Sequence, residues 1–300
     1  MRIKTLLFPI VLLPIASFAQ INITTRAEKI LKVEKYDSLS NFLGENYMAY
    51  IGQELFVLPK SENLRRYGYE GFYEEPEGKY YKPLKPSSLS SNTKYEMLEG
   101  KTFKVVDVFL KGKDIVNRDI IYFKLETEDD TLFYKYNARS KYSFPFVVLG
   151  YMDKLKKNYI GTRHCLRSIN DKSLIDYVTG ENVKMIPGTY WKCSDIIVDS
   201  KNYDIQMLFT NEKGETISNK DSHYKSLFIP EVIAKKLIAK YGKSMFDIAI
   251  NGKIKVGMTE ELVKVSWGEP KDINYSSYGS QWVYDGQYIY FKNGRVTDWN

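Results

Sequence analysis

The chain has 300 residues, and its 44 basic and 37 acidic side chains give a formal net charge of +7 at neutral pH. The acids and bases are interspersed, whereas nucleic-acid-binding proteins concentrate basic side chains on one face, so no nucleic-acid partner is predicted. Hydrophobic residues make up 43% of the sequence, which is enough to form folded cores. The 25 tyrosines favour a β-rich protein, because tyrosine suits half-buried sheet surfaces and contact faces.

The first 19 residues have the pattern of a secretory signal peptide. Arg2 and Lys4 precede the apolar run Leu6–Ile15, and the small residues of Ala16–Ala19 then predict cleavage after Ala19. The apolar run is too short to be a convincing membrane span, and no later segment approaches the required length. We therefore expect an exported protein, periplasmic or extracellular, without a transmembrane span.

Residues 20–47 are expected to form an N-terminal helical segment, with a helix over Arg26–Tyr36. Farther along, the stretch Tyr73–Thr93 is rich in proline, tyrosine and serine, which is typical of a long loop or a linker. A plain connector is the favoured interpretation of this stretch. The alternative is ligand contact through three interleaved aromatic side chains, Tyr73, Tyr80 and Tyr81.

An internal repeat organises the middle of the chain. Leu98–Leu110 aligns without a gap to Ile186–Val198, and a glycine, a lysine and an aspartate match at equivalent positions. A Tyr-Ile-Gly sequence, at 50–52 and at 159–161, precedes each copy. We expect two tandem β-rich, barrel-like domains over 48–150 and 151–242, SH3-like in the finer expectation. A helix closes each, near 151–158 in the first and after Pro230 in the second.

Cys165 and Cys193 are the only cysteines of an exported chain, so a single disulfide is allowed. The repeat alignment places them where the first copy has Phe56 and Val105, which favours buried core thiols instead. Although His164 neighbours Cys165, the chain lacks paired metal-ligand spacings such as C-x-x-C, so no metal site is predicted. The disulfide and the core thiols remain the two open alternatives.

The sequence contains neither a G-x-S-x-G elbow nor an H-E-x-x-H motif. A Cys-His pair is disfavoured because both cysteines lie in strand-like segments rather than at the start of a helix. We therefore assign no catalytic residue and expect no cofactor. A hydrolase with an unrecognised carboxylate pair is the least favoured alternative, because a glycosidase needs only two well-placed acids.

The last stretch, residues 243–300, gives the clearest local signals. Thr259 is suited to cap a helix that ends at Gly268, and acidic residues in its first turn complement the helix dipole. Asp285-Gly286 and Asn293-Gly294 then favour two tight type I′ hairpin turns. This pattern predicts one helix packed on a three-stranded antiparallel meander, and hence an α+β protein overall.

The two turns fix a register, which pairs Val283 with Tyr288 and Tyr288 with Trp299. One face then carries the expected core residues: Trp282, Tyr284, Ile289, Phe291 and Val296. The opposite face carries Val283, Tyr288, Tyr290, Thr297 and Trp299. Because exposed Tyr and Trp are typical interface anchors, we predict a binding site at Val283, Tyr288, Tyr290 and Trp299. The alternative is that the preceding β-rich domain covers this face.

Several motifs of this stretch carry a family resemblance: Gly257-Met258-Thr259, Gly268-x-Pro270, Trp282-x-Tyr284 and Phe291-x-x-Gly294-x-Val296. They resemble the SmpA/OmlA type of outer-membrane assembly lipoprotein, whose wider fold group includes the repeated module of β-lactamase-inhibitory proteins. The resemblance implies a non-enzymatic envelope protein that binds another protein. A carbohydrate- or cell-wall-binding accessory module is our alternative interpretation of the chain. Those lipoproteins carry a cysteine after the signal segment; none stands there in this chain, so no lipid anchor is predicted.

Overall fold

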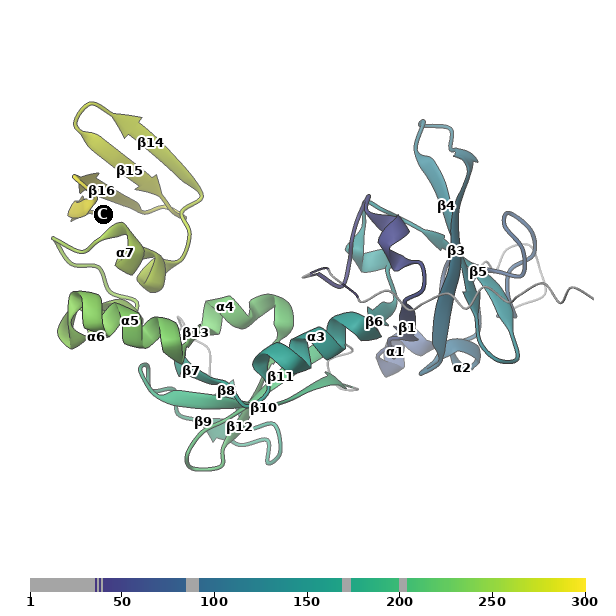
Figure 1. Cartoon of the computed structure of the whole chain (residues 1–300), viewed down its shortest axis with the longest axis horizontal. Helices are drawn as coiled ribbons and strands as arrows, with labels where there is room; N and C mark the ends of the chain where they lie inside the picture. The colour runs from purple at the N-terminus through teal and green to yellow at the C-terminus, as the bar shows by residue number, and fades with distance from the viewer. Residues whose placement is uncertain (1–35, 37, 39, 85–91, 169–173, 200–203) are drawn as a thin grey trace, which may run out of the picture. The chain divides into compact units, whose positions relative to one another are not determined.

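The computed structural model describes residues 36, 38, 40–84, 92–168, 174–199 and 204–300 (Figure 1). It is an α+β, strand-rich fold with curled antiparallel sheets that form a half-barrel, in agreement with the predicted class. The expected signal peptide over residues 1–19 lies outside the described residues, as does the expected helix over Arg26–Tyr36 except for its last residue. Among the residues that the structure describes, no helix combines the length and the apolarity needed to cross a membrane.

The first sheet has six strands in the order β2-β5-β4-β3-β1-β6. Their bounds are β1 (Glu54–Val57), β2 (Phe72–Tyr73), β3 (Thr102–Lys113), β4 (Asp119–Glu126), β5 (Thr131–Tyr136) and β6 (Phe146–Val148). The accompanying helices are η1 (Tyr47–Tyr50), α1 (Glu62–Arg65), α2 (Tyr95–Leu98), η2 (Lys141–Ser143) and α3 (Leu149–Tyr159). The helix α3 contains the residues at which a closing helix was expected.

The second sheet has five strands in the order β12-β11-β10-β7-β13. Their bounds are β7 (Arg163–Leu166), β10 (Tyr190–Asp199), β11 (Asp204–Thr210), β12 (Thr216–Lys220) and β13 (Phe228–Pro230), with a small hairpin of β8 (Leu174–Ile175) and β9 (Asn182–Val183). The helices are η3 (Asp221–His223), α4 (Tyr224–Leu227) and α5 (Glu231–Tyr241). As expected, α5 follows Pro230 and stops at Gly242.

The two aligned segments form the long strands β3 and β10 and share a detail of backbone structure. Both strands carry a β-bulge at the aligned place, between Val105 and Asp107 in one and between Cys193 and Asp195 in the other. The Asp107 carboxylate accepts the next backbone N–H at 2.8 Å, and Asp195 does the same at 2.7 Å. The matched aspartates thus stabilise a bulge, which explains why the two copies share them.

The Tyr-Ile-Gly sequences also have equivalent roles. The N–H of Gly52 donates to the Val105 carbonyl at 2.7 Å, and the N–H of Gly161 donates to the Cys193 carbonyl at 2.8 Å. Both glycines have φ values, 81° and 85°, that disfavour residues with a Cβ. Each glycine therefore connects the bulged strand of its copy to the segment that precedes the copy's first strand.

Cys165 and Cys193 are both buried and free, and they lie on opposite faces of the second sheet. Cys165 pairs with Tyr190 and packs in a cluster with Ile229, whereas Cys193 packs in the cluster of Trp191. Burial raises the pKa of the Cys165 thiol to about 11 and that of Cys193 to about 12. The structure thus selects the core thiols over the disulfide, since side chains on opposite faces of a sheet cannot bond.

The C-terminal module has a four-stranded sheet in the order β14-β15-β16-β17, where three strands were predicted. The bounds are α6 (Lys243–Ile250), α7 (Glu260–Trp267), β14 (Asp272–Ser276), β15 (Gly279–Val283), β16 (Tyr288–Lys292) and β17 (Arg295–Trp299). The additional strand β14 has no buried residue, although Ile273 and Tyr275 alternate with polar residues as in a strand. The helix α6 was also not predicted.

The helix α7 begins and ends where the sequence predicts. Gly268, with φ of 86°, terminates it, and acidic residues occupy its first turn. The Thr259 side chain, however, makes no capping hydrogen bond, although the residue occupies the N-cap position. Its backbone instead forms a bridge with Arg295 at the start of β17, which ties the helix to the sheet.

The two predicted turns differ in conformation. Asn293 and Gly294 both have positive φ values, 53° and 69°, as a type I′ turn requires. At the other turn Gly286 has positive φ but Asp285 does not, so that turn is not type I′. Both hairpins nevertheless form at the expected places in the chain.

Candidate functional site

The pairing of β15 with β16 follows the prediction. Trp282 lies opposite Ile289 and Val283 opposite Tyr288, and the Tyr284 N–H donates to the Gln287 carbonyl at 2.9 Å. Four of the five side chains expected in the core are almost fully buried: Trp282, Ile289, Phe291 and Val296. The fifth, Tyr284, is half-buried, and its hydroxyl donates to the Gly268 carbonyl at 3.0 Å.

The pairing of β16 with β17 departs from the prediction after one pair. Phe291 lies opposite Val296 as expected, but a bulge then places Ile289, rather than Tyr288, opposite Trp299. The extra residue is Thr297, whose hydroxyl donates to the Tyr290 carbonyl at 3.2 Å. Since directly opposed side chains share a face, Trp299 lies on the face of Ile289, and its predicted place beside Tyr288 and Tyr290 is wrong.

The face opposite the core retains three of the four predicted site residues. Val283 and Tyr288 are direct cross-strand neighbours, and Tyr290 lies two residues farther along β16. Tyr288 and Tyr290 are each 36% exposed, so both rings reach solvent. We call this surface the outer face of the C-terminal sheet; by the register it comprises Asp272, Asn274, Gln281, Val283, Tyr288, Tyr290, Lys292, Arg295 and Asp298.

Polar side chains form an ordered row across the outer face. The Asn274 amide donates to the Gln281 side-chain oxygen at 3.0 Å, and the Gln281 amide donates to the Tyr290 hydroxyl at 3.1 Å. Asp298 lies opposite Tyr290 on the last strand. These bonds hold the amides and the tyrosine hydroxyl in fixed positions, which reduces the entropy lost when a partner binds.

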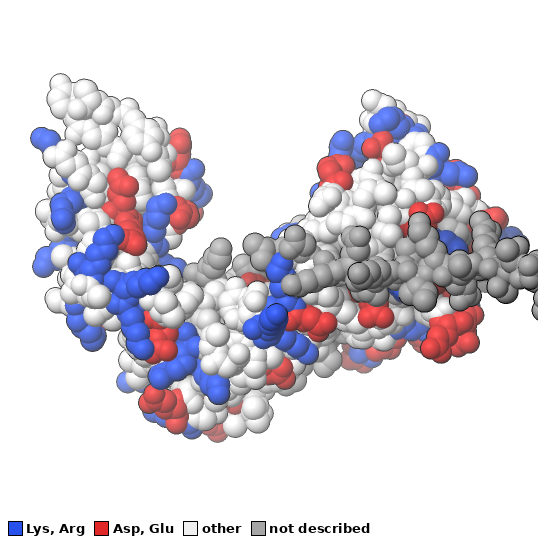
Figure 2. All heavy atoms as spheres, viewed as in Figure 1, with Lys and Arg blue, Asp and Glu red and all other residues white. Residues whose placement is uncertain are grey.

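The hairpin between β14 and β15 carries two further tyrosines that sequence reasoning did not select. Tyr275 is 81% exposed and Tyr278 is 86% exposed. Figure 2 shows mostly uncharged side chains at the top of this module on the side in view. Large aromatic rings at such exposure are unusual for a surface with no contact role.

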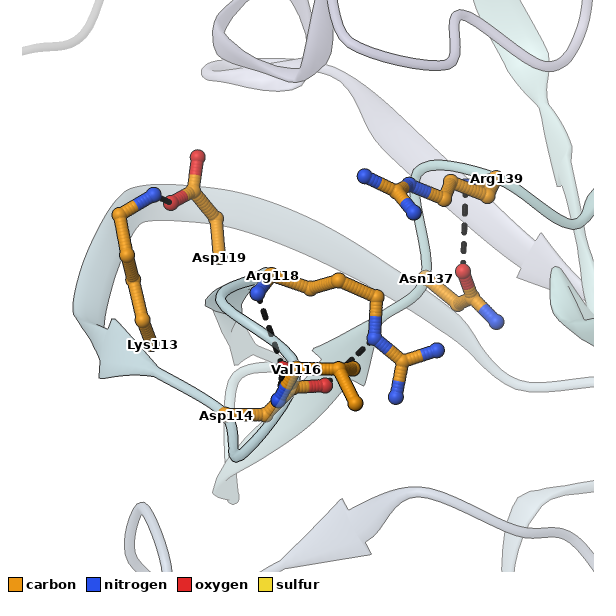
Figure 3. Close-up of polar contacts among 7 residues, drawn as sticks. All are labelled: Lys113, Asp114, Val116, Arg118, Asp119, Asn137 and Arg139. Carbon is orange, nitrogen blue, oxygen red and sulfur yellow. Dashed lines mark hydrogen bonds and ion pairs between the residues drawn. The ribbon is translucent and has the colours of Figure 1, made fainter.

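A cleft of about 410 Å³ opens in the first repeat. The loop between β3 and β4 and the segment that follows β5 form its walls, and the buried Ile121, Tyr134 and Tyr136 contribute to its lining. Two ion pairs stand in the first wall, Lys113 with Asp119 at 2.6 Å and Arg118 with Asp114 at 2.5 Å (Figure 3). No local motif in the sequence indicated this cleft, because its lining comes from several separate segments.

Asp114 organises the loop between β3 and β4. One carboxylate oxygen accepts the backbone N–H of Val116 at 3.0 Å and that of Arg118 at 2.9 Å, while the other accepts from the Arg118 side chain. The backbone N–H of Arg118, and then its guanidinium, hold the pKa of the Asp114 carboxyl below its ordinary value. These two hydrogen bonds to Asp114 hold the backbone and the Nε atom of Arg118 in place at the wall of the cleft.

The aromatic residues of the predicted loop 73–93 separate into two groups. Tyr81 is buried, and its hydroxyl donates to the Asp130 carboxylate, so ligand contact through Tyr81 is wrong. The rings of Tyr73 and Tyr80 pack against each other with their centroids 4.9 Å apart. The Tyr73 ring also packs against that of Tyr122, with a centroid separation of 5.7 Å. Residues 85–91 of this stretch lie outside the described residues.

His164 is buried, and both of its ring nitrogens have partners. Nε2 lies 2.7 Å from the Thr162 hydroxyl, and Nδ1 lies 2.6 Å from the Tyr224 hydroxyl. Burial lowers the pKa of His164 to about 4. The imidazole is therefore neutral at physiological pH, and its neighbour Cys165 lies on the other face of the sheet, so the pair does not form a catalytic dyad.

Within the described part of the chain, no group of three or more His, Cys, Asp or Glu side chains could hold a metal ion. Comparisons of the chain with protein-family models, with curated proteins and with solved structures found no match.

Proposed function

We propose that this chain is an exported, non-enzymatic protein of the cell envelope that binds another protein through the outer face of its C-terminal sheet. The observation that carries the proposal is the pair Tyr288 and Tyr290, which stand half-exposed beside Val283 on an ordered sheet. Tyrosine provides a large amphipathic contact area and loses little conformational entropy when it is held in an interface.

The distribution of apolar and polar side chains on the outer face resembles that of a protein interface. Aromatic and aliphatic side chains occupy its middle, and the amides of Asn274 and Gln281 with Asp298 supply polar contacts. Protein interfaces commonly combine an apolar centre with a polar rim. The signal-peptide pattern of residues 1–19 supports the exported location.

We further propose that the two repeats are SH3-like domains. Support comes from the strand orders β5-β4-β3-β1-β6 and β12-β11-β10-β7-β13, which are the same in both copies, and from a short 3₁₀ helix that precedes the last strand of each. For the C-terminal module we propose the SmpA/OmlA-like fold, with which the packing of α7 against one face of an antiparallel sheet is compatible.

Carbohydrate or cell-wall binding is the second candidate function. The observation that favours it is the pair of exposed rings Tyr275 and Tyr278 in the same module as the hydrogen-bonded amides of Asn274 and Gln281. Aromatic faces stack on sugar rings, and amides can bond to sugar hydroxyls. In this case the hairpin tip, rather than the outer face, would supply the main contact.

The test combines Tyr288→Ala with Tyr290→Ala in the full chain. Chemical cross-linking in the envelope fraction, followed by mass spectrometry, should identify a partner of the wild-type protein that the double variant fails to capture. Trp299→Ala is the matched control, because the bulge places this ring on the other face, and it should retain the partner. Circular dichroism and thermal melting establish that both variants remain folded.

Two results would contradict the proposal. One is a folded double variant that captures the same partner as the wild type; the other is equal loss in the Trp299→Ala control. Binding to a glycan array that Tyr275→Ala with Tyr278→Ala removes, and that Tyr288→Ala with Tyr290→Ala leaves intact, would favour the carbohydrate function.

A further inference from the structure

Exposed apolar side chains adjoin, along the chain, several residues that line the cleft of the first repeat. We call these side chains, Ile115, Val116 and Tyr142, the rim of the cleft. Ile115 and Val116, at the tip of the loop between β3 and β4, are exposed, and Ile115 is as accessible as in an extended chain. Tyr142 in η2, the chain neighbour of the lining residue Ser143, is 91% exposed. Each of the three is a chain neighbour of a residue that lines the cleft, so a ligand in the cleft can extend over them and cover apolar surface.

The charges of the cleft are balanced but only partly paired. Four acidic and four basic side chains line it. Two ion pairs use Lys113, Asp114, Arg118 and Asp119. The other four, Glu45, Glu70, Lys135 and Arg139, have no ion pair with any described residue of the chain.

Arg139 is exposed and is one of the two cations among these groups. Its backbone N–H donates to the Asn137 side-chain oxygen at 3.1 Å, which fixes the residue at the start of its loop. Figure 3 shows the Arg118 side chain extended toward the loop that carries Asn137 and Arg139. Arg118 bonds to Asp114 through Nε, and Arg139 has no ion pair with a described residue. Both guanidinium groups therefore have terminal N–H groups available for a carboxylate.

We propose that this cleft binds an extended peptide segment that carries an acidic residue, an apolar residue and a basic residue close together. The carboxylate of the peptide bonds to Arg139, with Arg118 beside it, and its basic group lies near Glu45 or Glu70. Its apolar side chain covers Ile115, Val116 or Tyr142. This site is separate from the outer face of the C-terminal sheet and does not depend on it.

The balance of charge favours a peptide over other ligands. A phosphate or a nucleic acid would meet as many carboxylates as cations in this cleft, and the repulsion would offset the attraction. A neutral glycan would leave Arg139 and the two glutamates without partners. A peptide of mixed charge satisfies both signs, and the rim supplies the hydrophobic contact that its affinity requires.

The experiment uses the full chain and a random dodecapeptide display library. Peptides enriched on the wild-type protein should share an acidic residue near an apolar one. A fluorescein-labelled copy of the most enriched peptide then gives dissociation constants by fluorescence polarisation. Arg139→Gln should weaken its binding about 5- to 20-fold, as expected for loss of a charge-assisted bond.

A second peptide, with glutamine in place of the acidic residue, makes the test specific. It should bind the wild-type protein more weakly by a similar factor, yet it should bind the Arg139→Gln variant about as well as the acidic peptide does. Lys111→Gln is the matched control, because this exposed lysine of β3 does not line the cleft, and it should not change either affinity.

The outcomes separate this proposal from the proposed function. The Tyr288→Ala and Tyr290→Ala double variant should bind the labelled peptide as well as the wild-type protein does. The proposal is overturned if the library yields no enriched peptide, if enriched peptides show no acidic preference, or if Arg139→Gln leaves both affinities unchanged.

Discussion

The two repeats fill the same framework with different chemistry, and the difference centres on one position. In the first repeat Leu55 of β1 lies opposite Phe103 of β3; in the second, His164 of β7 lies opposite Trp191 of β10. Leu55 and His164 are both buried, so the second repeat has an imidazole where the first repeat has a purely apolar side chain.

The second repeat tolerates this imidazole because its neighbours satisfy it. The Thr162 hydroxyl donates to the Tyr159 carbonyl at 2.5 Å, which leaves its oxygen free to accept from His164 Nε2. The Tyr224 hydroxyl can then donate to Nδ1. The shared framework therefore accepts a buried polar group when both of its hydrogen-bonding atoms have partners.

The largest predicted effect is a dependence of stability on pH that only the second repeat contributes. His164 has an ordinary pKa of 6.5 and a folded pKa of about 4, so between these values the unfolded chain binds a proton that the folded chain excludes. Its contribution is therefore complete above pH 6.5 and is lost as the pH falls toward 4. The integrated loss is roughly 3 kcal/mol in the free energy of unfolding.

Urea denaturation of the full chain at several pH values between 4 and 7 measures this slope. His164→Leu introduces the residue of the first repeat, and it should remove that part of the slope while carboxylates continue to titrate in both proteins. If the wild type and the variant lose the same free energy over this range, the neutral buried imidazole is not the cause.

The second prediction concerns what the two repeats share. Asp107→Ala and Asp195→Ala each remove a carboxylate that accepts a backbone N–H at the bulge. We expect each substitution to lower the free energy of unfolding by about 1 kcal/mol, the usual contribution of one hydrogen bond. Denaturant unfolding measures both, and Asp107→Asn and Asp195→Asn, which keep an oxygen acceptor, serve as matched controls.

Equal effects in the two strands would support a common structural role for the aspartates. A loss in one strand alone, or an equal loss with the asparagine controls, would contradict the assignment of the hydrogen bond as the shared element.

The sequence could predict the features that local chemistry determines. Gly268 and the Asn293-Gly294 turn were recognisable because a positive φ restricts the residue type, and the aspartate repeated at the bulge was recognisable by alignment. Trp299 was assigned to the wrong face because the bulge at Thr297 has no residue-type signature, and a shift of one residue reverses a face. The cleft of Arg118 and Arg139 depends on tertiary contacts between segments, which no local pattern shows.

The smallest predicted effect concerns Cys193, a thiol of the second repeat that has no counterpart in the first. Cys193 is buried at the position of Val105 in the first repeat, and its sulfur is in a packed apolar cluster. Cys193→Val should change the free energy of unfolding by less than about 1 kcal/mol, because both side chains are apolar and the first repeat already has valine at the aligned position. Urea denaturation under reducing conditions gives this value. Cys193→Ser, which buries a hydroxyl instead, should lower the free energy of unfolding by more.

If the valine variant is the less stable of the two, then packing around the two bulged strands differs, and the residue-by-residue equivalence of the repeats does not extend to their cores.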